Sequence, residues 1–245
     1  MKAIAIAGAM ALCLVPSACE TTAGGDLGTV LGGVLGGSTT QSGLTTAEID
    51  AGLKQALTIG AERVAGQIGV TDGYFGDPQI KIPLPGRLGE LQRQFDGVPF
   101  VSPLFNDLEL RMNRAAESAV PVAKELVVDA VTSITLQDAL GILQGGDTAA
   151  TDFLRGRTET SLRQAFTPHV DQALSESGAF QALQSVTSAP GVSTVVGDYK
   201  NDLTTHAVNL GLNGLFFYVA EEEKRIRENP VARTTDLLRK VFGSR

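Results

Sequence analysis

A long apolar stripe is the feature of this sequence that most restricts its fold. It follows Ser102-Pro103, and its members are spaced alternately three and four residues apart: Phe105, Leu108, Met112, Ala115, Ala119, Val122 and Leu126. This spacing puts them on one face of a long helix, with Ser102 as the cap and Pro103 in the first turn. Pro121 is expected to kink this helix, because it lacks an amide and crowds the carbonyl four residues back. A chain with such a helix should pack it against other helices.

The rest of the sequence agrees with a mainly α fold. Hydrophobic residues make up 43% of the chain but aromatic residues only 5%, and there is no Trp, so the core must consist mostly of aliphatic side chains; this composition favours packed helices. We expect a single domain of about eight helices with one short extended or edge-strand segment at residues 79–85, whose prolines exclude a central strand. Besides the helix at Ser102, helices are expected at residues 45–67, 88–95, 135–144, from 147 or 148, and at 158–175, 179–187, 198–228 and 230–242.

The N-terminal residues have the pattern of an export signal. Lys2 precedes an apolar run from Ala3 to Val15, and Ser17-Ala18-Cys19 resembles a lipoprotein processing site. We therefore predict a lipoprotein signal peptide at residues 1–18, a lipid on Cys19 that anchors the chain to a membrane, and a Gly/Thr/Ser-rich tether at 19–43. Glu20, where inner-membrane lipoproteins commonly have Asp, predicts the periplasmic face of the outer membrane. Cleavage nearby without lipidation, which leaves a soluble exported protein, is the alternative.

The tether has a second interpretation. Gly28, Gly32 and Gly36 repeat every four residues, as in glycine zippers that let membrane helices approach closely. Too few apolar residues surround them for a membrane span, so we interpret the segment as a flexible linker to a domain at residues 44–245.

Charge and cysteine content exclude several classes of function. The formal net charge is −7, which disfavours nucleic-acid binding. Cys13 lies in the signal peptide and Cys19 at its end, so the domain has no cysteine for a disulfide or a thiolate metal site. The two histidines, His169 and His206, fall in separate predicted helices. We expect neither a metal nor a cofactor.

Common catalytic motifs are absent from the sequence. It has no nucleophile elbow, phosphate loop, dinucleotide fingerprint or zinc-protease helix. The stretch from Asp72 to Asp77 has Tyr74 and Gly76 where a calcium loop needs oxygen ligands, so it is interpreted as a turn. Asp147, after Gly145-Gly146, is expected to cap the helix that follows and so to keep external anions away from its amides.

Glu222 is the most informative residue for a candidate site. Val208, Leu212, Leu215, Val219 and Ile226 form an apolar seam whose missing member falls on position 222. A carboxylate there should be partly buried and paired with a base, for which the candidates are Arg114, Lys81 and Arg233. The pair is either a structural ion pair or part of a functional pocket. The neighbouring pairs Glu221 with Arg225 and Glu223 with Arg227 have the spacing of an exposed helix face.

Six segments of the chain resemble one bacterial family, the domain of unknown function 4197. They are Gly52-Leu-Lys-Gln-Ala-Leu57, Lys81-Ile-Pro-Leu-Pro85, Asn113-Arg-Ala-Ala-Glu117, Asp138-Ala-Leu-Gly-Ile-Leu-Gln-Gly-Gly146, Ala220-Glu-Glu-Glu-Lys-Arg-Ile-Arg227 and Asn229-Pro-Val-Ala-Arg-Thr-Thr-Asp-Leu-Leu-Arg-Lys-Val-Phe-Gly243. The resemblance covers about residues 44–243 and implies an exported, largely helical domain without an established activity. Asn113, Arg114, Glu117, Glu222 and Arg233 lie in the shared motifs, but the resemblance assigns them no role.

These observations predict a binding or scaffolding domain in the cell envelope, whose ligand is an apolar molecule or a partner protein. One alternative is an enzyme that uses a buried carboxylate and arginine, such as Glu222 with Arg114. The other is a structural homodimer in which the stripe from Phe105 to Leu126 pairs between chains.

Overall fold

The computed structural model describes residues 45–189, 192 and 199–243. All of them belong to one unit, Thr39–Arg245. The predicted signal peptide, Cys19 and the predicted tether lie outside the described residues. The described chain is mainly α-helical, as predicted, with eight α-helices, one 3-10 turn and no β-strand.

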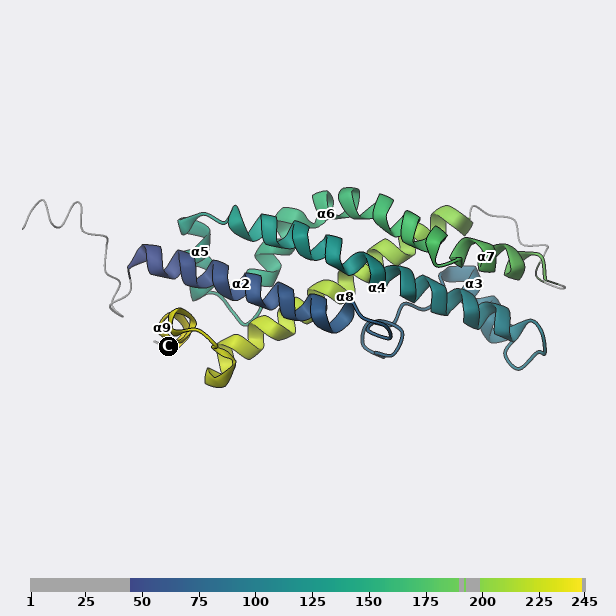
Figure 1. The fold of residues 1–245 in the computed structure, drawn as a ribbon, viewed down its shortest axis with the longest axis horizontal. Coiled ribbons are helices and arrows are strands. Elements are labelled where there is room, and N and C mark those ends of the chain that lie inside the picture. The colour runs from purple at the N-terminus through teal and green to yellow at the C-terminus, as the bar shows by residue number, and fades with distance from the viewer. Residues whose placement is uncertain (1–44, 190–191, 193–198, 244–245) are drawn as a thin grey trace, which may run out of the picture. The chain divides into compact units, whose positions relative to one another are not determined.

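Figure 1 shows how the helices are arranged in the described part of the chain. In chain order they are α2 (Thr46–Ile68), α3 (Gly86–Gln94), α4 (Ser102–Thr132), α5 (Leu136–Gln144), α6 (Ala149–Glu176), α7 (Ala179–Thr187), α8 (Tyr199–Glu228), the 3-10 turn η1 (Pro230–Ala232) and α9 (Asp236–Gly243).

Local sequence signals account for several helix starts. Thr45 and Glu48 form a reciprocal capping box at the start of α2, and Thr135 and Asp138 form another at the start of α5. Pro103 lies in the first turn of α4, where a missing amide costs no hydrogen bond. The same helix continues through Pro121.

Helix α4 is the centre of the packing and contacts α2, α6, α7 and α8. Its predicted stripe is buried at Phe105, Leu108, Met112, Ala115 and Ala119, whereas Val122 and Leu126 are half-buried. The stripe is therefore occupied by helices of the same chain, which removes the observation that had suggested pairing between two chains.

Three predicted elements differ from those in the structure. The helices expected from residue 147 or 148 and at 158–175 are a single helix, α6, which continues through Pro168. The C-terminal helix expected at 230–242 is divided into η1 and α9. Residues 79–85 form no strand; Ile80, Ile82 and Leu84 in this segment are nevertheless buried alternately, as in an extended chain.

The length and composition of the described helices bear on membrane insertion. None of them is by itself long and apolar enough to cross a membrane. By length and composition alone, α4 and α5 together would meet the criteria for a membrane span that is bent by 105° between the two helices.

Candidate functional site

Glu222 lies on α8 with 9% of its surface exposed, in the position the apolar seam predicts. Arg63 of α2 donates from Nη1 to its Oε1 at 2.7 Å. Arg225 donates from Nε to Oε2 at 2.8 Å and from Nη2 to Oε1 at 2.7 Å. Both carboxylate oxygens are thus bound by guanidinium groups. The partners are not those expected from the sequence, and Arg225 binds Glu222 rather than Glu221.

The three predicted partners of Glu222 hold other parts of the fold. Arg114 binds Glu117 and Asp72, each at 2.7 Å. Lys81 pairs with Glu109 at 3.1 Å and lies over the ring of Phe75. The predictions that Arg114 or Lys81 pairs with Glu222 are therefore wrong, because Arg114 on α4 binds Asp72 of the loop after α2, and the same loop brings Lys81 to Glu109 of α4.

Arg233 is the third candidate, and it also does not pair with Glu222. Its Nε donates to the carbonyl of Ile226 at 3.0 Å and its Nη2 to the carbonyl of Arg227 at 2.7 Å. These carbonyls belong to the last turn of α8, whose C-terminal acceptors have no partner within the helix. Arg233 therefore caps α8 and fixes the turn that leads to α9.

Glu223 was predicted to lie on an exposed face, and this prediction is wrong. Its side chain and that of Arg227 are each 5% exposed and paired at 2.7 Å. Its oxygens also accept from the backbone amides of Ala150 at 2.9 Å and Thr151 at 2.8 Å, and from the Thr151 hydroxyl at 2.8 Å. Glu223 thus occupies the N-terminal amides of α6. Asp147, which was expected to cap this helix, is exposed.

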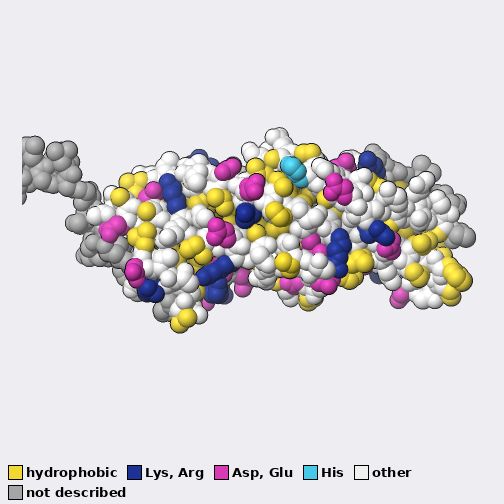
Figure 2. All heavy atoms as spheres, viewed as in Figure 1, with side chains coloured by type: hydrophobic (Ala, Val, Ile, Leu, Met, Phe, Trp, Pro, Cys, Tyr) yellow, Lys and Arg dark blue, Asp and Glu magenta, His cyan; other side chains and the backbone are white. Residues whose placement is uncertain are grey.

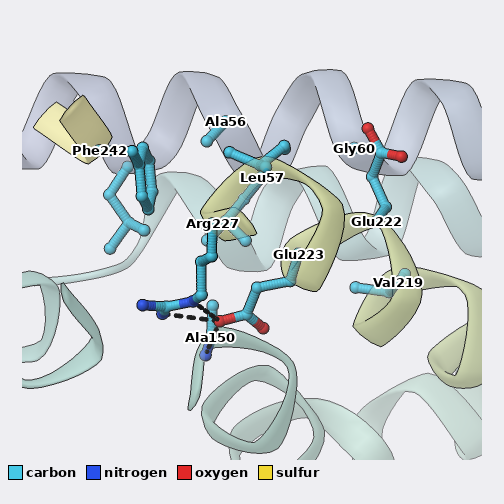
Figure 3. Close-up of a pocket in the computed structure, with 11 residues that line it drawn as sticks. Ala56, Leu57, Gly60, Ala150, Val219, Glu222, Glu223, Arg227 and Phe242 are labelled. Carbon is cyan, nitrogen blue, oxygen red and sulfur yellow. Dashed lines mark hydrogen bonds and ion pairs between the residues drawn. The ribbon is translucent and has the colours of Figure 1, made fainter. Parts of the chain in front are cut away.

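Arg227 extends the buried cluster to a third helix. It donates from Nη2 to the carbonyl of Ile142 at 2.9 Å, near the C-terminal end of α5. Figure 3 shows Arg227 and Glu223 directed toward Ala150, while the Glu222 carboxylate turns away toward Gly60 on α2. The two adjacent glutamates of α8 therefore join it to different elements: Glu222 to α2, and Glu223 to α6 and, through Arg227, to α5.

A small apolar cavity lies between α2, α8 and α9 beside these glutamates (Figure 3). Among its lining residues are Leu57, Gly60, Val219, Ile226 and Phe242. Its volume is about 20 Å³, which is room for about one water molecule. An apolar ligand of the size expected in small-molecule sites, about 300 Å³ or more, does not fit here.

The outer side of the Glu222 ion pair borders an open polar groove between α2 and α8, with a volume of about 700 Å³. Three basic and three acidic residues line it: Arg63, Lys224, Arg225, Glu221, Glu222 and Glu228. These charges balance, so the groove does not select an ion of one sign. Because Arg63 and Arg225 hold both Glu222 oxygens, the carboxylate has no free oxygen directed into the groove as a general base would need.

Asn113 and Glu117 fasten the loop after α2 to α4. The buried Asn113 side chain accepts from the Ile82 amide at 2.9 Å and donates to the Ile82 carbonyl at 2.8 Å, as a neighbouring strand would. Glu117 accepts from the amides of Tyr74 and Phe75, both at 3.1 Å. These contacts hold residues 81–85 beside α4 without a strand partner, whereas residues 79 and 80 lie in a turn in which the Ile80 and Lys81 amides donate to the Asp77 carbonyl. Asn113, Arg114, Glu117 and Lys81 thus form a cluster separate from that of Glu222.

Tyr74 is the buried end of the same loop. Its hydroxyl donates to the carbonyl of Gly211 on α8 at 2.7 Å. Burial raises the pKa of this hydroxyl well above its ordinary value of 10, and the negative charge of Glu117 raises it further. Residues 72–77 form the predicted turn.

The histidines lie apart from both clusters. His206 has its Nε2 at 2.9 Å from the carbonyl oxygen of Pro83, and His169 is exposed. Within the described residues, no group of three His, Cys, Asp or Glu side chains is arranged to hold a metal ion.

Phe100 is a candidate that the sequence analysis missed. It is 89% exposed, in the loop between α3 and α4, with a φ of 69°. The Val101 amide donates to the Val98 carbonyl at 3.3 Å, so Pro99 and Phe100 are the central residues of a β-turn. Pro followed by a residue with positive φ is typical of a type II turn, whose third position favours Gly or Asn.

A Phe at this turn position is unusual for its backbone and for its exposure. A bulky residue with positive φ is an outlier, and such strain is often found at functional sites. Figure 2 shows hydrophobic side chains gathered at the end of the domain where this loop lies. Val98 of the same loop is 39% exposed. The sequence signal was Gly97-Val-Pro-Phe100, two apolar residues and a proline between two helices.

Comparison with known proteins gives a family but no activity. Searches of curated proteins and of solved structures found no match. A family described as "Protein of unknown function (DUF4197)" matches residues 43–243, which is most of the chain and agrees with the resemblance of its motifs. The chain belongs to the DUF4197 family.

Proposed function

We propose that the domain is a non-catalytic protein-docking module of the bacterial cell envelope, anchored by a lipid on Cys19, and that Phe100 is its docking residue. The observation that carries the proposal is the turn at Val98–Val101, which holds an almost fully exposed Phe ring on a backbone with a φ of 69°. Exposed aromatic residues on a fixed backbone are typical anchors of protein interfaces, because little conformational entropy is lost on binding.

The interior of the domain supports docking over the two other functions considered. The cavity beside Glu222, at about 20 Å³, is too small for an apolar ligand. The carboxylates of Glu222 and Glu223 are occupied by Arg63, Arg225 and Arg227 and by backbone amides. These buried polar groups stabilise helix junctions, which leaves the surface as the place to seek function.

Photo-crosslinking in the native cell tests the docking proposal. A photoreactive phenylalanine replaces Phe100 in the full chain, and the matched control replaces Val231, an apolar residue that is 87% exposed in η1. We expect a protein adduct of defined mass from position 100 and none from position 231. Equal labelling at both positions, or no protein adduct from position 100, contradicts the proposal.

The lipid anchor needs a separate experiment. Cells fed an alkyne-bearing fatty acid should incorporate it into the wild-type chain, because the proposed lipoprotein signal ends at Cys19. Cys19→Ser should abolish incorporation, whereas Cys13→Ser should not. Labelling that persists in Cys19→Ser would show that another residue is modified.

A further inference from the structure

We infer that a groove between the start of α3 and the first turns of α8 binds a neutral glycan that carries acetamido groups. This site is separate from Phe100, and the inference does not depend on the docking function. The groove is open to solvent and has a volume of about 470 Å³, within the range of small-molecule sites, about 300–1,000 Å³. It is lined by residues 85–87 on one side and, from α8, by Tyr199, Asn201, Asp202, Thr205, His206 and Asn209.

Helix geometry places polar side chains of α8 along the groove. Asp202, Thr205 and Asn209 follow each other at intervals of three and four residues. Side chains with this spacing are neighbours on one face of a helix. One face of α8 therefore presents a carboxylate, a hydroxyl and an amide in a row.

The opposite wall is fixed to the fold before any ligand binds. It follows the segment that the Asn113 side chain holds through the amide and carbonyl of Ile82. The Nε2 of His206 lies 2.9 Å from the carbonyl oxygen of Pro83 and joins this segment to α8. A groove that is already formed loses little conformational entropy when a ligand binds.

The amide of Asn209 is the observation that points to a ligand. Its Oδ1 is shielded from solvent and has no hydrogen-bond partner among the described residues, although the side chain lines the groove. Buried polar atoms without a partner are rare in proteins and cost free energy. Half a turn of the amide plane exchanges Oδ1 with Nδ2, so the side chain can offer a ligand an acceptor as well as a donor.

The lining favours a ligand that is polar and neutral. Arg87 and Asp202 carry opposite charges, so the groove does not select an ion of one sign. Among the described residues that line it there is no Val, Leu, Ile, Met or Phe, so it has no pocket for the apolar side chains of a bound peptide. Sugar hydroxyls both donate and accept hydrogen bonds, as these polar side chains require, and Tyr199 contributes an aromatic ring on which a sugar can pack.

The unpaired amide narrows the ligand to a glycan with acetamido groups. An acetamido group has one N–H donor and one carbonyl acceptor, so it can satisfy Asn209 in either orientation of the amide. Asn201 adds a second amide side chain to the same lining. Because the groove is open and has no apolar pocket, the affinity is modest, with a Kd on the order of 0.1–1 mM.

Calorimetric titration of the purified full chain with N,N′,N″-triacetylchitotriose tests the site. Asn209→Leu removes the amide at similar volume and should weaken binding at least about tenfold, as the loss of a hydrogen bond does. Its free energy of unfolding should not fall, because the Oδ1 it removes has no partner among the described residues. Thr205→Val, at an exposed position of the same face, should also weaken binding. The matched control is Asn106→Leu, exposed on α4 and outside the groove, which should bind as the wild type does.

Two further probes test the class of ligand. Maltotriose, which has hydroxyls but no acetamido group, and triglycine, which has amides but no sugar ring, should each bind at least about tenfold more weakly. No saturable binding of the chitotriose at about 10 mM, or equal weakening by Asn209→Leu and Asn106→Leu, overturns the site. Equal affinity for maltotriose overturns the acetamido specificity, and equal affinity for triglycine assigns the groove to a peptide and overturns the glycan.

Discussion

Glu223 and Arg227 form an ion pair within α8 in which each side chain is 5% exposed, and together they connect three helices. Glu223 accepts the first amides of α6, and Arg227 donates to a carbonyl at the end of α5. A carboxylate at a helix N-terminus and a guanidinium at a helix C-terminus both complement the partial charges there. The pair is therefore a junction among α5, α6 and α8.

Removing the Glu223 charge should destabilise the fold strongly. Glu223→Gln leaves the Arg227 guanidinium buried without its counter-ion, a situation that costs about 3–5 kcal/mol in proteins. Urea denaturation of the purified chain measures the free energy of unfolding. The control is Glu221→Gln, two residues away and exposed, which should change it by less than about 0.5 kcal/mol. Similar values for the two variants would show that the buried pair is not important for stability.

Removing the charge of the adjacent Glu222 should destabilise the fold much less, although Glu222 is also buried. Its partners Arg63 and Arg225 have side chains 34% and 48% exposed, so both guanidinium groups stay hydrated when the carboxylate is removed. Glu222→Gln is therefore expected to lower the free energy of unfolding by about 1 kcal/mol or less, the range of exposed ion pairs. The same urea titration checks this, and a loss as large as that of Glu223→Gln would contradict the assignment.

The contrast between these two residues shows what the sequence could predict. The period of apolar residues along α8 was sufficient to place position 222 inward, because side-chain direction follows helix geometry. It could not identify Arg63 as the partner, since that depends on how α2 packs across α8. The spacing of Glu223 to Arg227 by itself predicts an exposed face, whereas the start of α6 packs against Glu223 and both side chains are buried.

Tertiary contacts also explain other differences between the predicted and the observed elements. The segment at 79–85 alternates as an edge strand does, but its hydrogen-bond partner is the Asn113 side chain rather than another strand. Helix α6 continues past the expected break at Thr158, whose hydroxyl bonds back to the carbonyl of Leu154 within the helix at 2.5 Å. The capping box at Thr45 was predicted correctly, because both of its partners lie within four residues of each other.

Gly214 should not tolerate a methyl group. A Cβ there would lie 2.8 Å from a ring carbon of Tyr74 and 3.1 Å from the Cβ of Ile80. Tyr74 is fully buried and cannot move aside, so Gly214→Ala should lower the free energy of unfolding by about 1–3 kcal/mol, as overpacked core variants do. The gain in helix propensity offsets only part of this.

The matched control for Gly214 is Gly156 in α6, where a Cβ would meet nothing within 4 Å. Gly156→Ala should raise the free energy of unfolding by about 0.5–1 kcal/mol through helix propensity alone. Thermal unfolding of both variants measures the two effects. Stabilisation of both would show that α8 lies farther from the Tyr74 loop than the structure places it.

The raised pKa of Tyr74 predicts loss of stability in alkali. The folded protein retains the hydroxyl proton above the ordinary pKa of 10, so the contribution is fully present below about pH 10 and is lost as the pH rises further. Wild-type free energy of unfolding should fall by up to about 1.4 kcal/mol per pH unit from this group. Tyr74→Phe should fall less steeply between about pH 9 and 11, as measured by urea titration.

Tyr218 also contributes to the loss of stability in alkali, and this contribution must be separated from that of Tyr74. Its hydroxyl donates to Asp77, which together with partial burial raises the pKa of Tyr218 to about 12. This contribution has the same sign and remains in Tyr74→Phe, so the difference between that variant and the wild type isolates Tyr74. Parallel pH profiles for the two proteins would contradict the burial of the Tyr74 hydroxyl.

Phe100 should behave unlike any core phenylalanine, because its backbone has the conformation that glycine prefers. Phe100→Gly relieves the positive φ, which costs an L-residue about 1–2 kcal/mol, and adds flexibility to the unfolded chain, which costs about 0.5–1 kcal/mol. The free energy of unfolding should therefore be unchanged or rise by up to about 1.5 kcal/mol. Phe105→Ala, fully buried in α4, should lose about 3–5 kcal/mol. If Phe100→Gly also loses more than about 1 kcal/mol in urea denaturation, the ring has a role in the fold, and its exposure cannot be the reason for retaining a strained turn.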